Sequence, residues 1–238
     1  METVNPYASP YSVAQSPDNV RTTFYQKTYL HLAGAIAVFI FLELALFSIP
    51  GIETKVLGMM TGFNWLIVLG LFMVASWVAN KWAMSDTSRG MQYAGLGLYL
   101  IAEAIIFLPL LVIATYYTGQ DGLIGQAGII TAGLFAGLTF VAFTTKKDFS
   151  FLGGMLKVAF FVALGLIVAS IFMGFNLGLW FSGAMVLVAG GSILYQTSNI
   201  IHHYRPDQHV AASLGLFASV ALLFWYVLQI LISLSNND

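Results

Sequence analysis

Seven long apolar stretches follow one another along the chain, and short polar breaks separate them. Each stretch supplies the roughly 20 apolar residues that a helix needs to cross the hydrocarbon core of a bilayer. A transmembrane β-barrel would instead show alternating segments of about ten residues. The pattern therefore predicts an all-α integral membrane protein, a bundle of seven transmembrane helices. The predicted spans are residues 29–49, 62–82, 91–117, 122–144, 152–175, 178–201 and 210–233.

The predicted spans divide the chain into an N-terminal tail, a transmembrane domain and a short C-terminal tail. Residues 1–28 are polar and contain Pro6, Pro10 and Pro17 but no apolar core, so they do not form a cleavable signal peptide. We expect a flexible, cytoplasmic N-terminal tail, with the first apolar stretch as an uncleaved anchor. Residues 29–233 form the transmembrane domain, and residues 234–238 form a short C-terminal tail on the extracytoplasmic side.

Composition supports the membrane interpretation. Hydrophobic residues make up 59% of the chain and charged residues only 8%, against about a quarter charged in soluble proteins. Such a chain could not cover a water-exposed surface, so its main partner is the lipid bilayer. The nine lysines and arginines are scattered, which argues against a nucleic-acid partner. Cysteine is absent, so disulfides and thiolate chemistry are excluded.

The positive charges predict an orientation. With the N-terminus inside, only Lys55 lies on an outer flank, and Lys157 lies near the inner end of the fifth span, where a lysine can snorkel. This bias predicts a cytoplasmic N-terminus and an extracytoplasmic C-terminus. The inner flanks then hold Arg21, Lys27, Lys81, Arg89, Lys146, Lys147 and Arg205.

Small residues recur at three- and four-residue spacing in the fourth span. Because close packing of small residues drives helix association in lipid, we expect this helix to be central and tightly packed. Gly190-Gly191 suggests a similar role in the sixth span. The alternative is that glycine is simply common in membrane helices. The residues of the fourth span are Gly125, Gly128, Ala132 and Ala136, with Gly133 and Gly137 beside them.

Two carboxylates lie inside predicted spans and are the candidate ion or proton site. Glu103 is in the middle of the third span and Glu43 in the outer half of the first. A charge at the bilayer centre costs about 2.5–3.5 kcal/mol on insertion scales, so each should face the bundle interior, be protonated or be paired. Pro109 frees the carbonyl of Ile105 near Glu103. The alternative is a protonated, structural glutamate.

A polar run ends the sixth span and could either line a vestibule or mark the membrane interface. It comprises Tyr195, Gln196, Thr197, Ser198 and Asn199.

Catalytic, metal and cofactor sites are not expected. The loop histidines His202, His203 and His209 lack a recognised ligand spacing. No H-E-x-x-H motif is present. Ser192 follows two glycines, but the only histidine within a predicted span, His31, lies far away in the sequence. The last span has no lysine for a retinal.

Three segments of the chain are distinctive: T-T-K-K-D-F-S-F-L-G-G at 144–154, Y-A-G-L-G-L-Y-L-I-A-E-A-I-I-F-L-P-L-L at 93–111 and G-G-S-I-L-Y-Q-T-S-N-I-I at 190–201. Together they resemble the Bax inhibitor-1 family of seven-helix membrane proteins, and more closely its bacterial YccA-like branch. The resemblance covers residues 25–232. It implies a bundle with helix seven near its centre, a bacterial inner-membrane location and a role in membrane stress.

The resemblance implies two functions that differ in class. One is a slow calcium or proton leak; familiar leak members carry paired aspartates at positions that correspond here to Gln196 and Ser219, neither of which can ionise. The other is binding and modulation of the membrane AAA protease FtsH, which could grip the polar tail. Continuous polar residues through the bundle would favour the leak, and a sealed interior would favour the binding partner.

Overall fold

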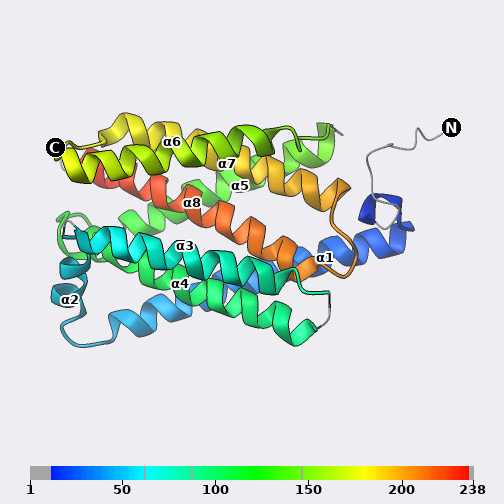
Figure 1. The fold of residues 1–238 in the computed structure, drawn as a ribbon, viewed down its shortest axis with the longest axis horizontal. Coiled ribbons are helices and arrows are strands. Elements are labelled where there is room, and N and C mark those ends of the chain that lie inside the picture. The colour runs from blue at the N-terminus through cyan, green and yellow to red at the C-terminus, as the bar shows by residue number, and fades with distance from the viewer. Residues whose placement is uncertain (1–11, 62, 87, 146, 236–238) are drawn as a thin grey trace.

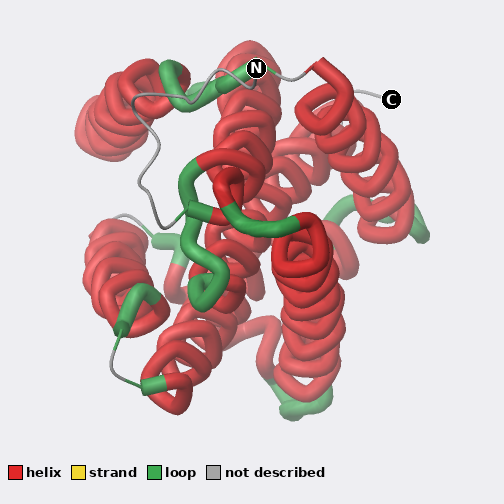
Figure 2. Tube along the Cα trace, turned by 90° about the vertical axis from the view of Figure 1, so that its right-hand side faces the viewer, coloured by secondary structure: helices red, strands yellow, loops and turns green. Residues whose placement is uncertain are grey.

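The computed structural model describes residues 12–61, 63–86, 88–145 and 147–235, and this part of the chain is helical without strands. Figure 1 shows the helices side by side, with the start of the first helix (blue) and the end of the last helix (red) at opposite ends of the bundle. Figure 2 shows the short loops that connect them, seen from the end that carries the N-terminus. The elements are η1 (Val13–Gln15), α1 (Asp18–Phe47), α2 (Ile52–Met59), α3 (Phe63–Ala83), α4 (Arg89–Tyr116), α5 (Leu123–Thr145), α6 (Leu152–Met173), α7 (Gly178–His202) and α8 (His209–Ser235).

The seven predicted spans are confirmed. All described helices except α2 and the short η1 are long and apolar enough to cross a membrane, seven in total. Residues 62 and 146, at a predicted boundary and a predicted inner flank, lie outside the described residues. The C-terminal tail begins later than predicted, because α8 continues to Ser235.

The prediction of a flexible tail over residues 1–28 is wrong for its described part. Helix α1 begins at Asp18, and Phe24 and Thr28 on it are almost completely buried. Before the helix, Val13 is fully buried and its N–H donates to the carbonyl of Tyr204 at 2.8 Å. These residues are ordered because their few apolar side chains pack on the bundle. Residues 1–11 lie outside the described residues.

The break after the first span contains a helix that the hydropathy pattern did not predict. Gly51 turns the chain with a φ of 70°, a conformation that favours glycine, and α2 follows at once. Its buried residues Ile52 and Val56 pack against Leu108 and Val112 of α4. Eight residues are too few to span a bilayer, so α2 covers one end of α4.

Helix α8, the seventh transmembrane helix, is central as expected. It packs against α1, α3, α4, α5 and α7. In Figure 1 it runs between α6 and α7 above and α3 and α4 below. Fifteen residues are buried in α8 and fifteen in α4, but only four in α5 and one in α6.

The expectation that the fourth span is central and tightly packed is therefore wrong. A Cβ added at Gly125, Gly128, Gly133 or Gly137 would meet nothing within 4 Å. Helix α5 packs against α7 and α8 with another face and leaves its glycine-rich side open. Spacing alone does not say which side of a helix its neighbours occupy. The close approach is made instead by Gly95 of α4, where a Cβ would lie 2.5 Å from the Ala79 carbonyl oxygen of α3.

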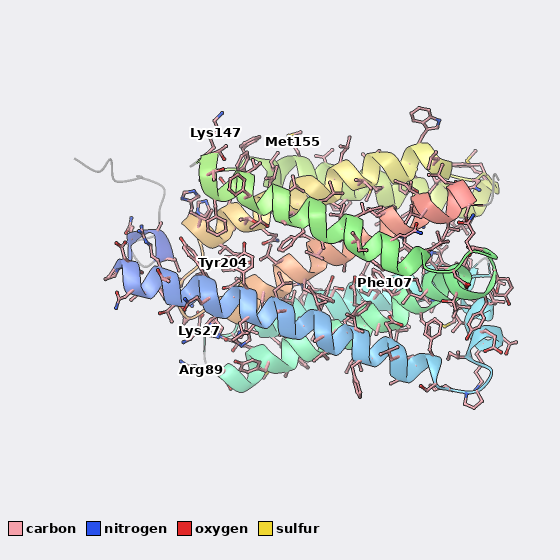
Figure 3. All side chains as sticks on the ribbon, turned by 180° about the vertical axis from the view of Figure 1, so that it is seen from behind. Lys27, Arg89, Phe107, Lys147, Met155 and Tyr204 are labelled. Atoms are coloured by element: carbon pink, nitrogen blue, oxygen red, sulfur yellow. The ribbon has the colours of Figure 1, made fainter. Side chains whose placement is uncertain are left out.

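Positive charges gather at the N-terminal end of the bundle. Figure 3 shows Lys27, Arg89 and Lys147 at this end, together with Tyr204, while Phe107 lies toward the other end. The structure agrees with the one-sided distribution that the sequence predicted. Which end faces the cytoplasm stays a prediction.

Candidate functional site

A cavity of about 970 Å³ lies between the α3–α4 and α6–α7 hairpins, with α8 as its floor. It opens on the surface of the bundle, because its lining residues Met73, Phe160 and Phe175 are exposed. Most of its wall is aliphatic or aromatic. The polar lining residues include Glu103, Ser182, Ser192 and Gln229. The cavity therefore lies within the spanning region and combines an apolar wall with a few polar groups.

Glu103 projects from α4 into this cavity and is only 5% exposed. One turn earlier on the same face, the Tyr99 hydroxyl lies near its carboxyl group and interacts with it. The second oxygen, Oε2, has no hydrogen-bond partner. The ion pairs among the described residues do not include it. The expectation that Glu103 faces the bundle interior agrees with the structure.

Glu43 lies on α1, is 7% exposed and does not line the cavity. Both of its carboxyl oxygens lack hydrogen-bond partners. It is close enough to Glu103 for the two charges to interact. The structure thus brings the two predicted site residues into one region, although they come from helices far apart in the sequence. Ionising both would be costly, because like charges repel strongly in a medium of low dielectric constant.

The contact between α7 and α8 at mid-bundle is made by hydroxyl groups. Ser192 and Ser219 lie 2.7 Å apart, Oγ to Oγ. Ser219 donates its proton to the carbonyl of Gly215 at 3.0 Å, so Ser192 is the donor between the two serines. Nearer the C-terminal end, the Ser182 hydroxyl donates to Gln229 Oε1 at 3.1 Å. Both contacts are neutral.

Gln196 lies one turn beyond Ser192 on α7 and packs on Gly215. A Cβ at Gly215 would come within 2.8 Å of Gln196 Oε1, so the side-chain amide of Gln196 fits here because residue 215 has no side chain. That oxygen is buried without a hydrogen-bond partner. Gln196 and Ser219, the positions that match the paired acids of leak members, therefore meet the same turn of α8 around Gly215. They carry no charge there.

None of the five residues of the polar run lines the cavity, and those other than Gln196 join elements at the N-terminal end. Tyr195 packs on Gly153, where a Cβ would lie 2.9 Å from its ring. The hydroxyl of the fully buried Thr197 faces Tyr29 of α1, but neither oxygen has a hydrogen bond of good geometry. The Asn199 carbonyl accepts the N–H groups that follow α7. The vestibule interpretation finds no support in these contacts.

Sequence reasoning missed the role of Asp148, although it lies in the most characteristic motif of the chain. Its Oδ1 accepts hydrogen bonds from Ser198 Oγ at 3.0 Å and Ser150 N–H at 2.9 Å, and its Oδ2 lies 3.1 Å from His203 Nε2. Burial acts to raise the pKa of Asp148, but the hydrogen bonds and the nearby His203 outweigh it, so the pKa lies below its usual value. Ser198 also accepts the N–H of Phe149 at 2.8 Å.

These contacts close the N-terminal end of the bundle. The α5–α6 loop is tied to α7 through Asp148, and Arg205 pairs with Asp86 of the α3–α4 loop. Tyr204 is partly buried, and the loss of hydration around its hydroxyl raises its pKa to about 12. Within the described residues, the histidines form no group of three or more metal-ligating side chains with aspartate or glutamate.

Comparison with known proteins gives a consistent result. A family model described as inhibitor of apoptosis-promoting Bax1 matches residues 21–237. Bax inhibitor 1 of Schizosaccharomyces pombe is 30% identical over 240 residues, which cover 99% of this chain and 85% of that protein. The modulator of FtsH protease YccA of Escherichia coli is 37% identical over 122 residues, 50% of this chain and 55% of that protein. The Golgi anti-apoptotic protein of vaccinia virus (strain Lister) is 28% identical over 234 residues, 92% of this chain and 89% of that protein.

Proposed function

Because the chain belongs to the Bax inhibitor-1 family of membrane proteins, we propose that it is a non-enzymatic modulator that binds and restrains a membrane AAA protease of the FtsH kind. The relative named modulator of FtsH protease supports this assignment, over half of the chain. The observation that carries it is the neutral contact between α7 and α8. Ser219, at one of the two positions where leak members carry acids, pairs with the hydroxyl of Ser192, and the uncharged Gln196 occupies the other position.

Two surfaces suit a protein partner. The open glycine-rich side of α5 would let the backbone of a partner helix approach closely, which is how small residues stabilise helix pairs in lipid. The polar residues before α1 offer a segment that a protease could engage from the aqueous phase.

The test is reconstitution of an FtsH-type protease with this chain in liposomes. We expect the rate of degradation of a membrane substrate to fall severalfold, in proportion to the amount of chain. Gly128→Leu and Gly133→Leu, on the open side of α5, should weaken the inhibition of the protease. They should also lower the yield of chemical cross-links between the chain and the protease. Gly165→Leu is the matched control, since it is equally open but lies on α6. An unchanged degradation rate at saturating chain would refute the proposal.

A cation or proton leak is the second candidate, and the burial of Glu103 and Glu43 within one region favours it. In this structure, however, Ile193, Ile200 and Leu216 are fully buried between Ser192 and the N-terminal end. A leak would require these side chains to move apart. Calcium and proton flux into liposomes that contain the purified chain would decide between the two candidates.

A further inference from the structure

The cavity contains a single acid and no base to balance it. Glu103 is the one charged residue among the described residues that line it. Only 5% of the Glu103 surface is exposed to solvent, and its Oε2 has no hydrogen-bond partner. A carboxyl group in this setting is costly to ionise alone, and a cation in the cavity would supply the missing counter-charge.

Aromatic rings line the same cavity as this acid. Phe107 is one turn from Glu103 on the same face of α4. Its ring centroid is 5.0 Å from that of Trp225 on α8, at an interplanar angle of 83°. Trp65 of α3 stacks on Trp225 with centroids 6.4 Å apart. All three rings line the cavity, and aromatic faces, tryptophan above all, attract organic cations.

We propose that this cavity is a binding site for a lipophilic organic cation. Its positive centre lies between Glu103 and the rings of Phe107 and Trp225, and its apolar body fills the remaining wall. The volume of about 970 Å³ is at the upper end of the range of about 300–1,000 Å³ for small-molecule sites. The cavity opens at exposed apolar residues within the spanning region, so a cation dissolved in the bilayer can enter from the side.

Other ligand classes fit less well. Calcium takes about 6–8 oxygen ligands, and Glu103 supplies the one carboxylate among the described lining residues. An anionic lipid would place its charge against an acid. A hydrocarbon chain without a polar head would leave Glu103 Oε2 without a partner. The site does not depend on protease binding, so it stands or falls independently of the proposed function.

The test uses tetraphenylphosphonium and tetraphenylborate, ions of nearly the same size and shape but opposite charge. Binding of each is measured by equilibrium dialysis with the full chain in lipid nanodiscs, and empty nanodiscs give the background from partition into lipid. We expect one saturable site for the cation and none for the anion. Tetraphenylborate should not compete.

Two variants locate the site. Glu103→Gln should weaken binding of the cation by about tenfold or more, and Trp225→Leu by about fivefold. Glu53→Gln, an acid of α2 outside the cavity, is the matched control and should bind like the parent chain. Trp225→Leu tests the same site independently, from another helix. Absence of saturable binding, equal binding of both ions, or full affinity in both variants would overturn the proposal.

Discussion

The hydroxyl oxygen of Ser192 on α7 lies 2.7 Å from that of Ser219 on α8. Because the Ser219 hydroxyl donates a hydrogen bond to the Gly215 carbonyl, the two serines form a directed chain of hydrogen bonds across the helix pair. A carboxylate pair at this place would respond to acid. A hydroxyl pair has no charge to change.

We therefore predict that the distance between α7 and α8 is insensitive to pH between about 5 and 8, where serine and glutamine do not titrate. Spin labels on the two helices, measured by double electron–electron resonance across this range, check the prediction. A large shift that persists after Glu43 and Glu103 are both replaced by glutamine would show that a different group controls the contact. His202, His203 and His209 would be examined first, since histidine titrates in this range.

Glu103→Gln should retain the fold, because the amide can still bond the Tyr99 hydroxyl. Glu103→Leu removes that partner, and we expect it to lower the free energy of unfolding by about 1–3 kcal/mol. Thermal unfolding in detergent micelles compares the two variants. If the chain conducts cations, the glutamine variant should lose the flux, and retention of full flux would make Glu103 a structural residue.

Gly95→Ala should destabilise the packing of α3 on α4. Its Cβ would lie 2.5 Å from the Ala79 carbonyl oxygen and 2.6 Å from the Ala83 nitrogen, both of which are backbone atoms that cannot rotate away. Overpacking of this kind costs typically about 1–3 kcal/mol. Gly97→Ala is the control on the same helix, since its Cβ would meet nothing within 4 Å. Equal unfolding temperatures for the two variants would contradict the close approach.

Asp148→Asn should loosen the N-terminal end of the bundle at neutral pH. The pKa of Asp148 is lower in the folded chain than its ordinary value, so its charge stabilises the fold above about pH 4, and this contribution disappears as the pH falls through the folded pKa. We expect a cost at pH 7 of at most about 1 kcal/mol, since the side chain is partly exposed. The free energies of unfolding of the variant and the parent chain, measured from pH 7 to 3, should become equal at low pH. A difference that stays constant over this range would exclude the charge as its cause.

The two chain ends should lie on opposite sides of the membrane. A reporter fused at Asp238 should be extracytoplasmic and one at Met1 cytoplasmic, because an odd number of spans separates them and the lysines and arginines gather at the N-terminal end. Compartment-specific alkaline phosphatase and fluorescent-protein fusions give the answer. Both reporters on one side would contradict the count of seven spans.

Hydropathy alone determined how many segments become membrane-spanning helices and roughly where they lie. The cost of moving a segment into lipid is summed residue by residue along that segment, so the number and limits of the spans are local properties. The interior position of Glu103 follows from the same argument, because lipid cannot solvate a carboxyl group. Hydropathy failed at α2 and at the start of α1, where a few buried side chains such as Val56 and Phe24 order a segment of mixed polarity.

Only the tertiary structure decided which helices pack together and what lies between them. The glycines of α5 have the spacing of a packing face but meet no neighbour, whereas the single Gly95 admits the backbone of α3. The cavity, the nearness of Glu43 to Glu103 and the bonds of Asp148 to Ser198 and His203 join residues from separate elements. These relations depend on the fit between helix surfaces, which is a property of pairs of helices and is not contained in the composition of either one.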